Sequence, residues 1–128
     1  MERDLEKVQE IYDGYERRDL ASVFQLLDKD VEFIQSNELP WGGHYIGHDG
    51  ARKFFAALRE HIDSRVILER LIDSGDRVVA VGRTVGKACA TQLEFDVPVV
   101  HVWTLQEGLV SRFEAYIDNA TMLVALGI

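Results

Sequence analysis

The chain has 128 residues, of which 47% are hydrophobic, and this fits one domain with its own core. Its formal net charge of −8 and isoelectric point near 4.9 argue against nucleic acid and anionic membranes as partners, since both attract basic faces. The N-terminal MERDLEKVQE lacks the apolar core of a signal peptide, and no apolar run reaches the roughly 20 residues of a membrane span. We therefore expect one soluble, cytoplasmic domain, residues 1–128.

The first half of the sequence predicts three helices and one strand. Apolar residues at helical spacing predict an amphipathic helix over 3–17. Asp19 is a suitable N-cap for a second helix. The segment 30–36, DVEFIQS, predicts a strand, and a third helix begins at His48 or Asp49. The apolar positions of the second helix are Leu20, Val23, Phe24 and Leu27.

After Asp63 the hydrophobic period changes to two, which is typical of strands. Two of the connections carry hairpin-turn residues, at 74–76 and 106–108. A short helix over 119–126 closes the chain. Helices followed by an antiparallel meander indicate the α+β class. The predicted strands are 65–73, 77–87, 91–105 and 109–118.

Cys89 is the single cysteine, so no intrachain disulfide can form. It falls inside a strand-like run, where a lone cysteine is expected to be a small core residue rather than a nucleophile.

Four segments are informative together: YERRDLASVFQLLDKDVEF, GGHYIGHDGARKFF, HVWTLQEGLV and RFEAYIDNATMLVAL. In their order and spacing they resemble the SnoaL-like group of the nuclear transport factor 2-like superfamily, over essentially the whole chain. The resemblance implies an α+β cone, in which a curved antiparallel sheet wraps around the N-terminal helices and encloses an apolar pocket. Many members are dimers through the outer sheet face, so it also implies a homodimer.

The resemblance further implies which side chains face the pocket. It places His101 and Trp103 inside the cone, together with Glu114, Tyr116 and Asp118 of the next strand. Alternation then assigns a set of apolar residues to the outer face, where a second subunit would cover them. That outer set includes Leu109, Phe113, Ala115 and Ile117. Further wall residues are expected to be Tyr12, Tyr15 and Phe33.

The loop 37–47 would cross the mouth of this cone. It is rich in glycine, which permits unusual backbone turns, and it carries Trp41, His44 and Tyr45. These three rings are expected to line the pocket as a wall or lid. The alternative is that Trp41 plugs the open end of the cone as a core residue.

Asp118 and His101 are the candidate catalytic residues. A carboxylate in an apolar pocket has a raised pKa and can exchange a proton near neutral pH, and a facing histidine can relay a second one. The alternatives are that Asp118 caps the last helix and that His101 is a core histidine with its hydrogen bonds satisfied.

Ketosteroid isomerase, which uses an Asp base with Tyr and protonated Asp donors, provides a comparison. By motif order those three groups would fall near Gln35, Ile11 and His101 of this chain, and none is kept. The isomerase site is therefore not carried over.

The sequence thus predicts a cofactor-free proton-transfer enzyme that acts on a small, apolar carbonyl compound by isomerisation, cyclisation or dehydration. The alternatives are a non-catalytic protein that binds a small ligand and a dimerisation module of the same fold. No metal site is expected, because no set of ligands has suitable spacing.

Overall fold

The structure is a computed structural model that describes residues 2–128, which form four helices and six strands. The helices are α1 (Glu2–Glu16), α2 (Leu20–Gln25), α3 (Gly47–His61) and α4 (Asn119–Leu126). The strands are β1 (Leu27–Gln35), β2 (Gly43–Ile46), β3 (Ile62–Ser74), β4 (Arg77–Ala88), β5 (Glu94–Gln106) and β6 (Leu109–Ile117).

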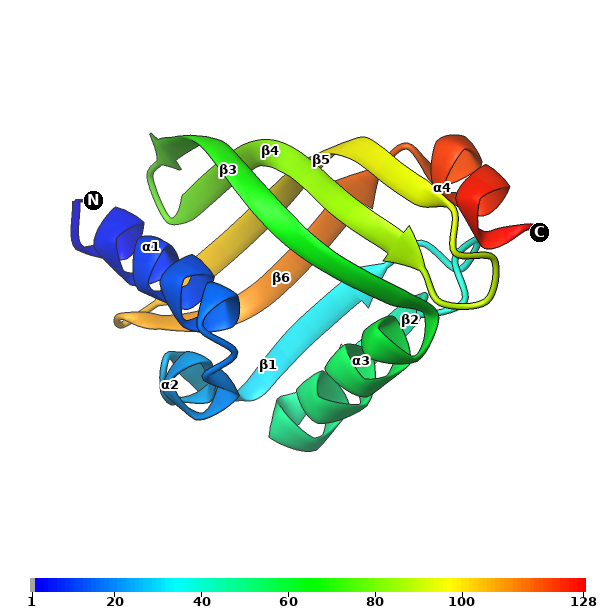
Figure 1. Cartoon of the computed structure of the whole chain (residues 1–128). Coiled ribbons are helices and arrows are strands. Elements are labelled where there is room, and N and C mark those ends of the chain that lie inside the picture. Colours follow the sequence, from blue (N-terminus) through cyan, green and yellow to red (C-terminus); the bar gives the residue numbers. More distant parts are fainter. Residues whose placement is uncertain (1) are drawn as a thin grey trace.

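The six strands form one sheet in the order β2-β1-β6-β5-β4-β3. Every neighbouring pair is antiparallel except β1 and β6, which run parallel. The sheet curves without closing, and α1 and α3 lie across its open side (Figure 1). This confirms the predicted α+β class and the curved sheet wrapped around helices.

Several predicted boundaries need correction. Leu27 begins β1 rather than ending the second helix. The loop 37–47 contains a short strand, β2, because its backbone pairs with β1 in the register Phe33 to Tyr45. Cys89 is exposed in the turn that follows β4, so it is not a core residue.

Contacts between aromatic rings hold α3 against the sheet. The Phe33 ring of β1 lies 5.3 Å from Phe54 and 5.6 Å from Phe55 of α3, and 5.0 Å from Phe113 of β6. The ring of Trp103 on β5 lies 4.4 Å from Phe113. Such tilted and edge contacts stabilise a core beyond their buried area, so these rings fix where α3 sits on the sheet.

A β-bulge decides which side chains of β6 face inward. Thr104 pairs with Arg112, but the next residue, Leu105, pairs with Val110, so Ser111 is left over. The additional residue reverses the alternation, and the inward residues become Val110 and then Phe113, Ala115 and Ile117.

The inward placement predicted for Glu114, Tyr116 and Asp118 is therefore wrong, since it assumed regular alternation along the whole strand. Tyr116 is 54% exposed, whereas Phe113 is 5% exposed. Phe113 and Ala115 belong to the core rather than to an outer face, so they provide no argument for a dimer. The homodimer itself stays a prediction.

The conformation of the loop before β2 depends on the glycine at position 42, Gly42. A Cβ atom at this position would lie 2.0 Å from the carbonyl oxygen of Ser36, so the backbones could not approach as they do. This close approach, together with the hydrogen bond from Gly42 N to Leu39 O (2.8 Å), directs Trp41 into the core, where it is 2% exposed.

We expect Gly42→Ala to lower the free energy of unfolding by about 1–3 kcal/mol, because the added methyl group must displace backbone. Equilibrium urea unfolding would measure the change. Asn37→Ala, at an exposed position of the same loop, is the control and should change stability by less than about 0.5 kcal/mol. Equal stability of the Gly42 variant and the parent would show that the loop yields without strain.

Candidate functional site

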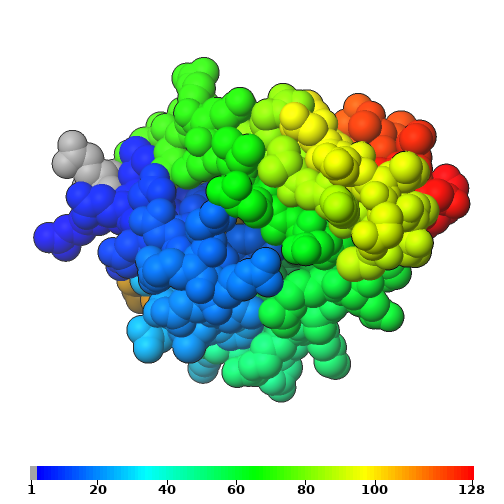
Figure 2. All heavy atoms as spheres, viewed as in Figure 1, coloured from blue at the N-terminus to red at the C-terminus, as the bar shows by residue number. Residues whose placement is uncertain are grey.

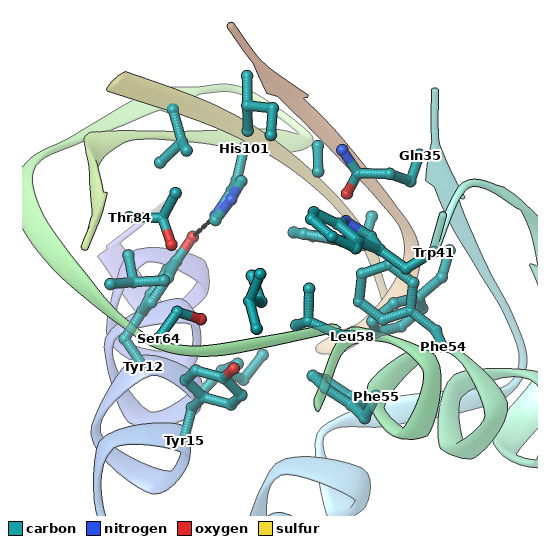
Figure 3. A pocket seen from close by; sticks show the side chains of 18 of the residues that line it. Tyr12, Tyr15, Gln35, Trp41, Phe54, Phe55, Leu58, Ser64, Thr84 and His101 are labelled. Atoms are coloured by element: carbon teal, nitrogen blue, oxygen red, sulfur yellow. Dashed lines mark hydrogen bonds between the residues drawn. The ribbon is translucent and has the colours of Figure 1, made fainter. Parts of the chain in front are cut away.

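The concave side of the sheet, α1 and α3 enclose a cavity of about 90 Å³ (Figure 3). Most of the lining is aliphatic or aromatic, and none of it is Asp, Glu, Lys or Arg. An apolar cavity of about 150 Å³ accommodates benzene, so this one fits a smaller group unless side chains move. Apart from the two tryptophans, the polar lining residues are Tyr12, Tyr15, Gln35, Ser64, Thr84 and His101.

A buried hydrogen-bond chain joins α1 to β5 in the cavity wall. Trp103 Nε1 donates to the Tyr12 hydroxyl oxygen at 2.9 Å, and that hydroxyl lies 2.6 Å from His101 Nδ1. The rings of Tyr12 and His101 are parallel, with centroids 5.9 Å apart. Tyr12 and His101 are each 9% exposed and Trp103 is 4% exposed, so water cannot replace these bonds at low cost.

The chain of donors sets the tautomer of His101. An indole N–H can only donate, so the Tyr12 oxygen is the acceptor of Trp103. The Tyr12 proton has no other acceptor among the residues that the structure describes, so it donates to Nδ1 of His101, and a neutral imidazole then carries its own proton on Nε2. Nε2 makes no hydrogen bond to any residue in 2–128. The site therefore offers an N–H donor to a ligand in the cavity.

Burial keeps this pair neutral. Desolvation lowers the pKa of His101 to about 4, so the imidazole carries no charge near pH 7. Desolvation also raises the pKa of Tyr12, and the hydrogen bond from Trp103 only partly opposes that rise. Both groups thus act as hydrogen-bonding partners rather than as ions at neutral pH.

Gln35 adds a second polar group to the cavity wall, from β1. Its side chain is 6% exposed, and its Nε2 atom is buried without a hydrogen-bond partner in the described part of the chain. Figure 3 shows Gln35 and His101 on the same side of the cavity. A buried amide without a partner is costly, and a polar ligand atom would satisfy it.

The structure brings six of the predicted residues to the cavity and leaves five outside. The six that line it are Tyr12, Tyr15, Phe33, Trp41, His101 and Trp103. The five that do not are His44, Tyr45, Glu114, Tyr116 and Asp118.

The two candidate catalytic residues are therefore apart. Asp118 is the N-cap of α4, where its carboxylate accepts hydrogen bonds from Thr121 N (3.2 Å) and Thr121 Oγ1 (2.7 Å). These bonds, that of the Thr121 hydroxyl first, lower the pKa of Asp118, the opposite of the predicted rise. The geometry supports the capping alternative for this residue.

The rings of the glycine-rich loop have separate roles. Trp41 lines the cavity from within the core, as the plug alternative predicted. Tyr45 lies outside the cavity, where its hydroxyl donates to the carbonyl oxygens of Trp41 and Gly42 at 3.2 Å. His44 is half exposed and lies 2.6 Å from Glu32 Oε1. No lid is formed by these side chains.

Sequence reasoning missed three polar lining residues. Ser64 lies between Ile62 and Val66 in its alternating set, and Gln35 ends the set Val31-x-Phe33-x-Gln35, so a polar residue in an otherwise apolar set was the available signal for these two. Thr84 lies between Gly82 and Gly86 and gave no such signal.

Two absences concern residues 2–128 only. No group of three or more His, Cys, Asp or Glu side chains in this range could hold a metal ion. Within the same range, no helix combines the length and the apolar character needed to cross a membrane.

Comparison with known proteins gives a family match and several similar structures. The model of the SnoaL-like domain matches residues 8–113, and no curated protein matches the chain. An NTF2-like protein of unknown function from Burkholderia pseudomallei is 30% identical over 100% of both chains, with a TM-score of 0.93. An NTF2-like protein from Burkholderia thailandensis is 29% identical over 96% of both chains (TM-score 0.90). TerC, co-crystallised with polyporic acid, is 24% identical over 98% of this chain and 99% of its own (TM-score 0.90), a likeness of fold alone.

The lowered pKa of His101 predicts acid sensitivity. Between the unfolded value near 6.5 and the folded value of about 4, the unfolded chain binds more protons, so stability falls as the pH falls. From about pH 7 to about pH 5 the free energy of unfolding should drop by about 2 kcal/mol through this residue. Urea unfolding at both pH values should show this drop in the parent but not in His101→Leu. An equal pH dependence in both proteins would contradict the burial of a neutral His101.

Proposed function

Because the chain belongs to the SnoaL-like domain family, we propose that its cavity binds a small, mostly apolar organic molecule through a carbonyl oxygen. The observation that carries the proposal is the chain Trp103–Tyr12–His101, which presents the Nε2–H of His101 inside an apolar cavity. A carbonyl oxygen is the neutral acceptor that complements such a donor.

Charge supports a neutral ligand head inside the cavity. No ionised side chain lines it, and both titratable partners are neutral near pH 7. Moving an ion into such a site would cost several kcal/mol without a paired charge. A ketone or aldehyde loses much less on desolvation, and one hydrogen bond from His101, or a second from the Gln35 amide, offsets that loss.

Cofactor-free proton transfer on the same carbonyl compound is the second candidate function. The observation that favours it is the hydrogen bond between Tyr12 and His101, along which a proton could pass as Nε2 donates to the carbonyl oxygen. Two features oppose it: burial raises the pKa of Tyr12, and no carboxylate lines the cavity to remove a proton from carbon. We therefore place binding ahead of catalysis.

The homodimer through the outer side of the sheet is also kept as a proposal, with other residues on that side than those predicted. The outer side of the sheet exposes Ile67, Val100 and Tyr116. Sedimentation equilibrium at micromolar concentration should show twice the chain mass, and a monomer would contradict it.

Acetone and isobutene form a matched pair of probes that are smaller than benzene and differ in the carbonyl oxygen, which isobutene replaces with a methylene group. We expect His101→Leu to weaken acetone binding roughly fivefold and to leave isobutene binding unchanged or tighter, because only the ketone uses the N–H donor. Ligand-observed NMR titration would measure both affinities. Asp118→Asn is the control and should bind both probes as the parent does.

Two results would count against the proposal. Equal acetone affinity in the parent and His101→Leu would remove His101 from recognition. Absence of binding by the parent to either probe would favour the dimerisation-module alternative, in which the cavity is part of a filled core. Exchange of the α-hydrogens of acetone for deuterium, faster with the parent than with His101→Leu, would instead favour the second candidate function, proton transfer.

A further inference from the structure

A second, larger pocket adjoins the cavity from outside. It has a volume of about 360 Å³ and lies between the end of α1, the second half of α3 and the start of β3. In Figure 2 this region lies where the blue α1–α2 segment meets the green α3–β3 segment. We call it the outer pocket and the cavity described above the inner pocket.

The two pockets share part of their walls. Five residues line both of them: Tyr15, Phe55, Leu58, Ile62 and Ser64. Figure 3 shows Tyr15 and Phe55 at the end of the inner pocket opposite His101 and Gln35. The two pockets therefore adjoin each other at these shared residues.

The outer pocket is charged, unlike the inner one. Three arginines and two carboxylates line it, which gives one excess positive charge in a chain whose formal charge is −8. Both carboxylates are already paired. Arg65 Nη2 lies 2.8 Å from Glu16 Oε1, and Arg18 Nη2 lies 3.7 Å from Asp63 Oδ1.

Arg59, in the last turn of α3, is the arginine that remains. No carboxylate of residues 2–128 lies within 4.0 Å of its guanidinium. Burial raises the pKa of Tyr15, while the hydrogen bond with Ser64 and the positive charges of Arg59 and Arg18 oppose that rise. Arg59 lines the outer pocket and directly follows Leu58, which lines both pockets, so it lies next to their boundary.

We propose that the ligand of this protein is a keto acid, whose carbonyl head occupies the inner pocket and whose carboxylate binds Arg59 in the outer pocket. The inference rests on the proposed carbonyl recognition by His101 and adds the charged end of the molecule. A guanidinium binds a carboxylate in a bidentate, charge-assisted manner, which no neutral ligand can reproduce.

The sizes of the pockets agree with this division. The inner pocket of about 90 Å³ holds only a small group, whereas the outer pocket of about 360 Å³ leaves room for the rest of the molecule. The apolar wall residues between them favour a hydrocarbon linker. The ligand class is therefore a carbonyl group and a carboxylate joined by a short apolar chain.

This arrangement can be tested by comparing the binding of levulinate and its homologues with the binding of their methyl esters. These methyl ketones carry a carboxylate after two to five methylene groups, and esterification removes only the charge. We expect the acid of best-fitting length to bind the parent about fivefold more tightly than its ester at low ionic strength. Arg59→Gln should abolish that preference, and Arg59→Glu should reverse it, with ester affinity unchanged in both variants.

Arg52→Gln is the matched control. It removes the same charge from the same helix, but Arg52 pairs with Asp49 and lines neither pocket. It should keep the preference for the acid. Isothermal titration calorimetry would give the affinities, and circular dichroism would verify that each variant is folded.

The outcomes separate this inference from the proposed function. If the esters bind but the acids bind no more tightly, or if Arg59→Gln keeps the preference, the carboxylate site is refuted while carbonyl recognition stands. If Arg52→Gln loses the preference as Arg59→Gln does, general charge rather than Arg59 is responsible and the inference fails. If neither acids nor esters nor acetone bind, the proposed function fails with it.

Discussion

The hydroxyl group of Tyr12 is the polar atom on which the arrangement of the site depends. It accepts from Trp103 and donates to His101, partners 91 and 89 residues away in the sequence, in a region closed to water. A buried donor or acceptor left without a partner costs about 1–3 kcal/mol, so α1 must keep the register that satisfies all three groups. The same bonds orient the imidazole and fix its proton on Nε2. Helix position and site chemistry are thus set by one constraint.

The polarity of the molecule changes along the route that a ligand would take. At the surface, arginines and carboxylates surround a wide pocket; further in, rings and aliphatic chains narrow it; at the end, neutral donors and an unpaired amide remain. A charged group would therefore have a lower desolvation cost in the outer pocket, whereas a neutral polar atom would gain a stronger hydrogen bond in the inner pocket. On the proposed function, this order of environments would favour an amphipathic molecule in one orientation.

Much of the fold, but less of the site, follows from the sequence. Alternation on β5 was regular, so His101 and Trp103 were placed correctly, and α4 has the predicted span. The bulge at Ser111 puts Val110 and Phe113 on the same face, whereas unbroken alternation would put them on opposite faces. That one residue moved Asp118 out of the predicted site. The role of Tyr12 was equally hidden, since a contact between α1 and β5 depends on the curvature of the whole sheet.

The parallel pairing of β1 with β6 has a consequence for biosynthesis. These strands pair in the register Phe33 to Phe113, so one wall of the cone is completed only by β6, the last strand of the sheet to be translated. While the ribosome is still translating β3 to β5, β1 can pair only with the four-residue β2, and its other edge is unpaired. Contacts between such distant segments form late, because a large loop must close before they contribute. The nascent polypeptide therefore carries an unpaired edge of β1, next to Phe33, until β6 has been translated, and this is the stage at which aggregation competes with folding.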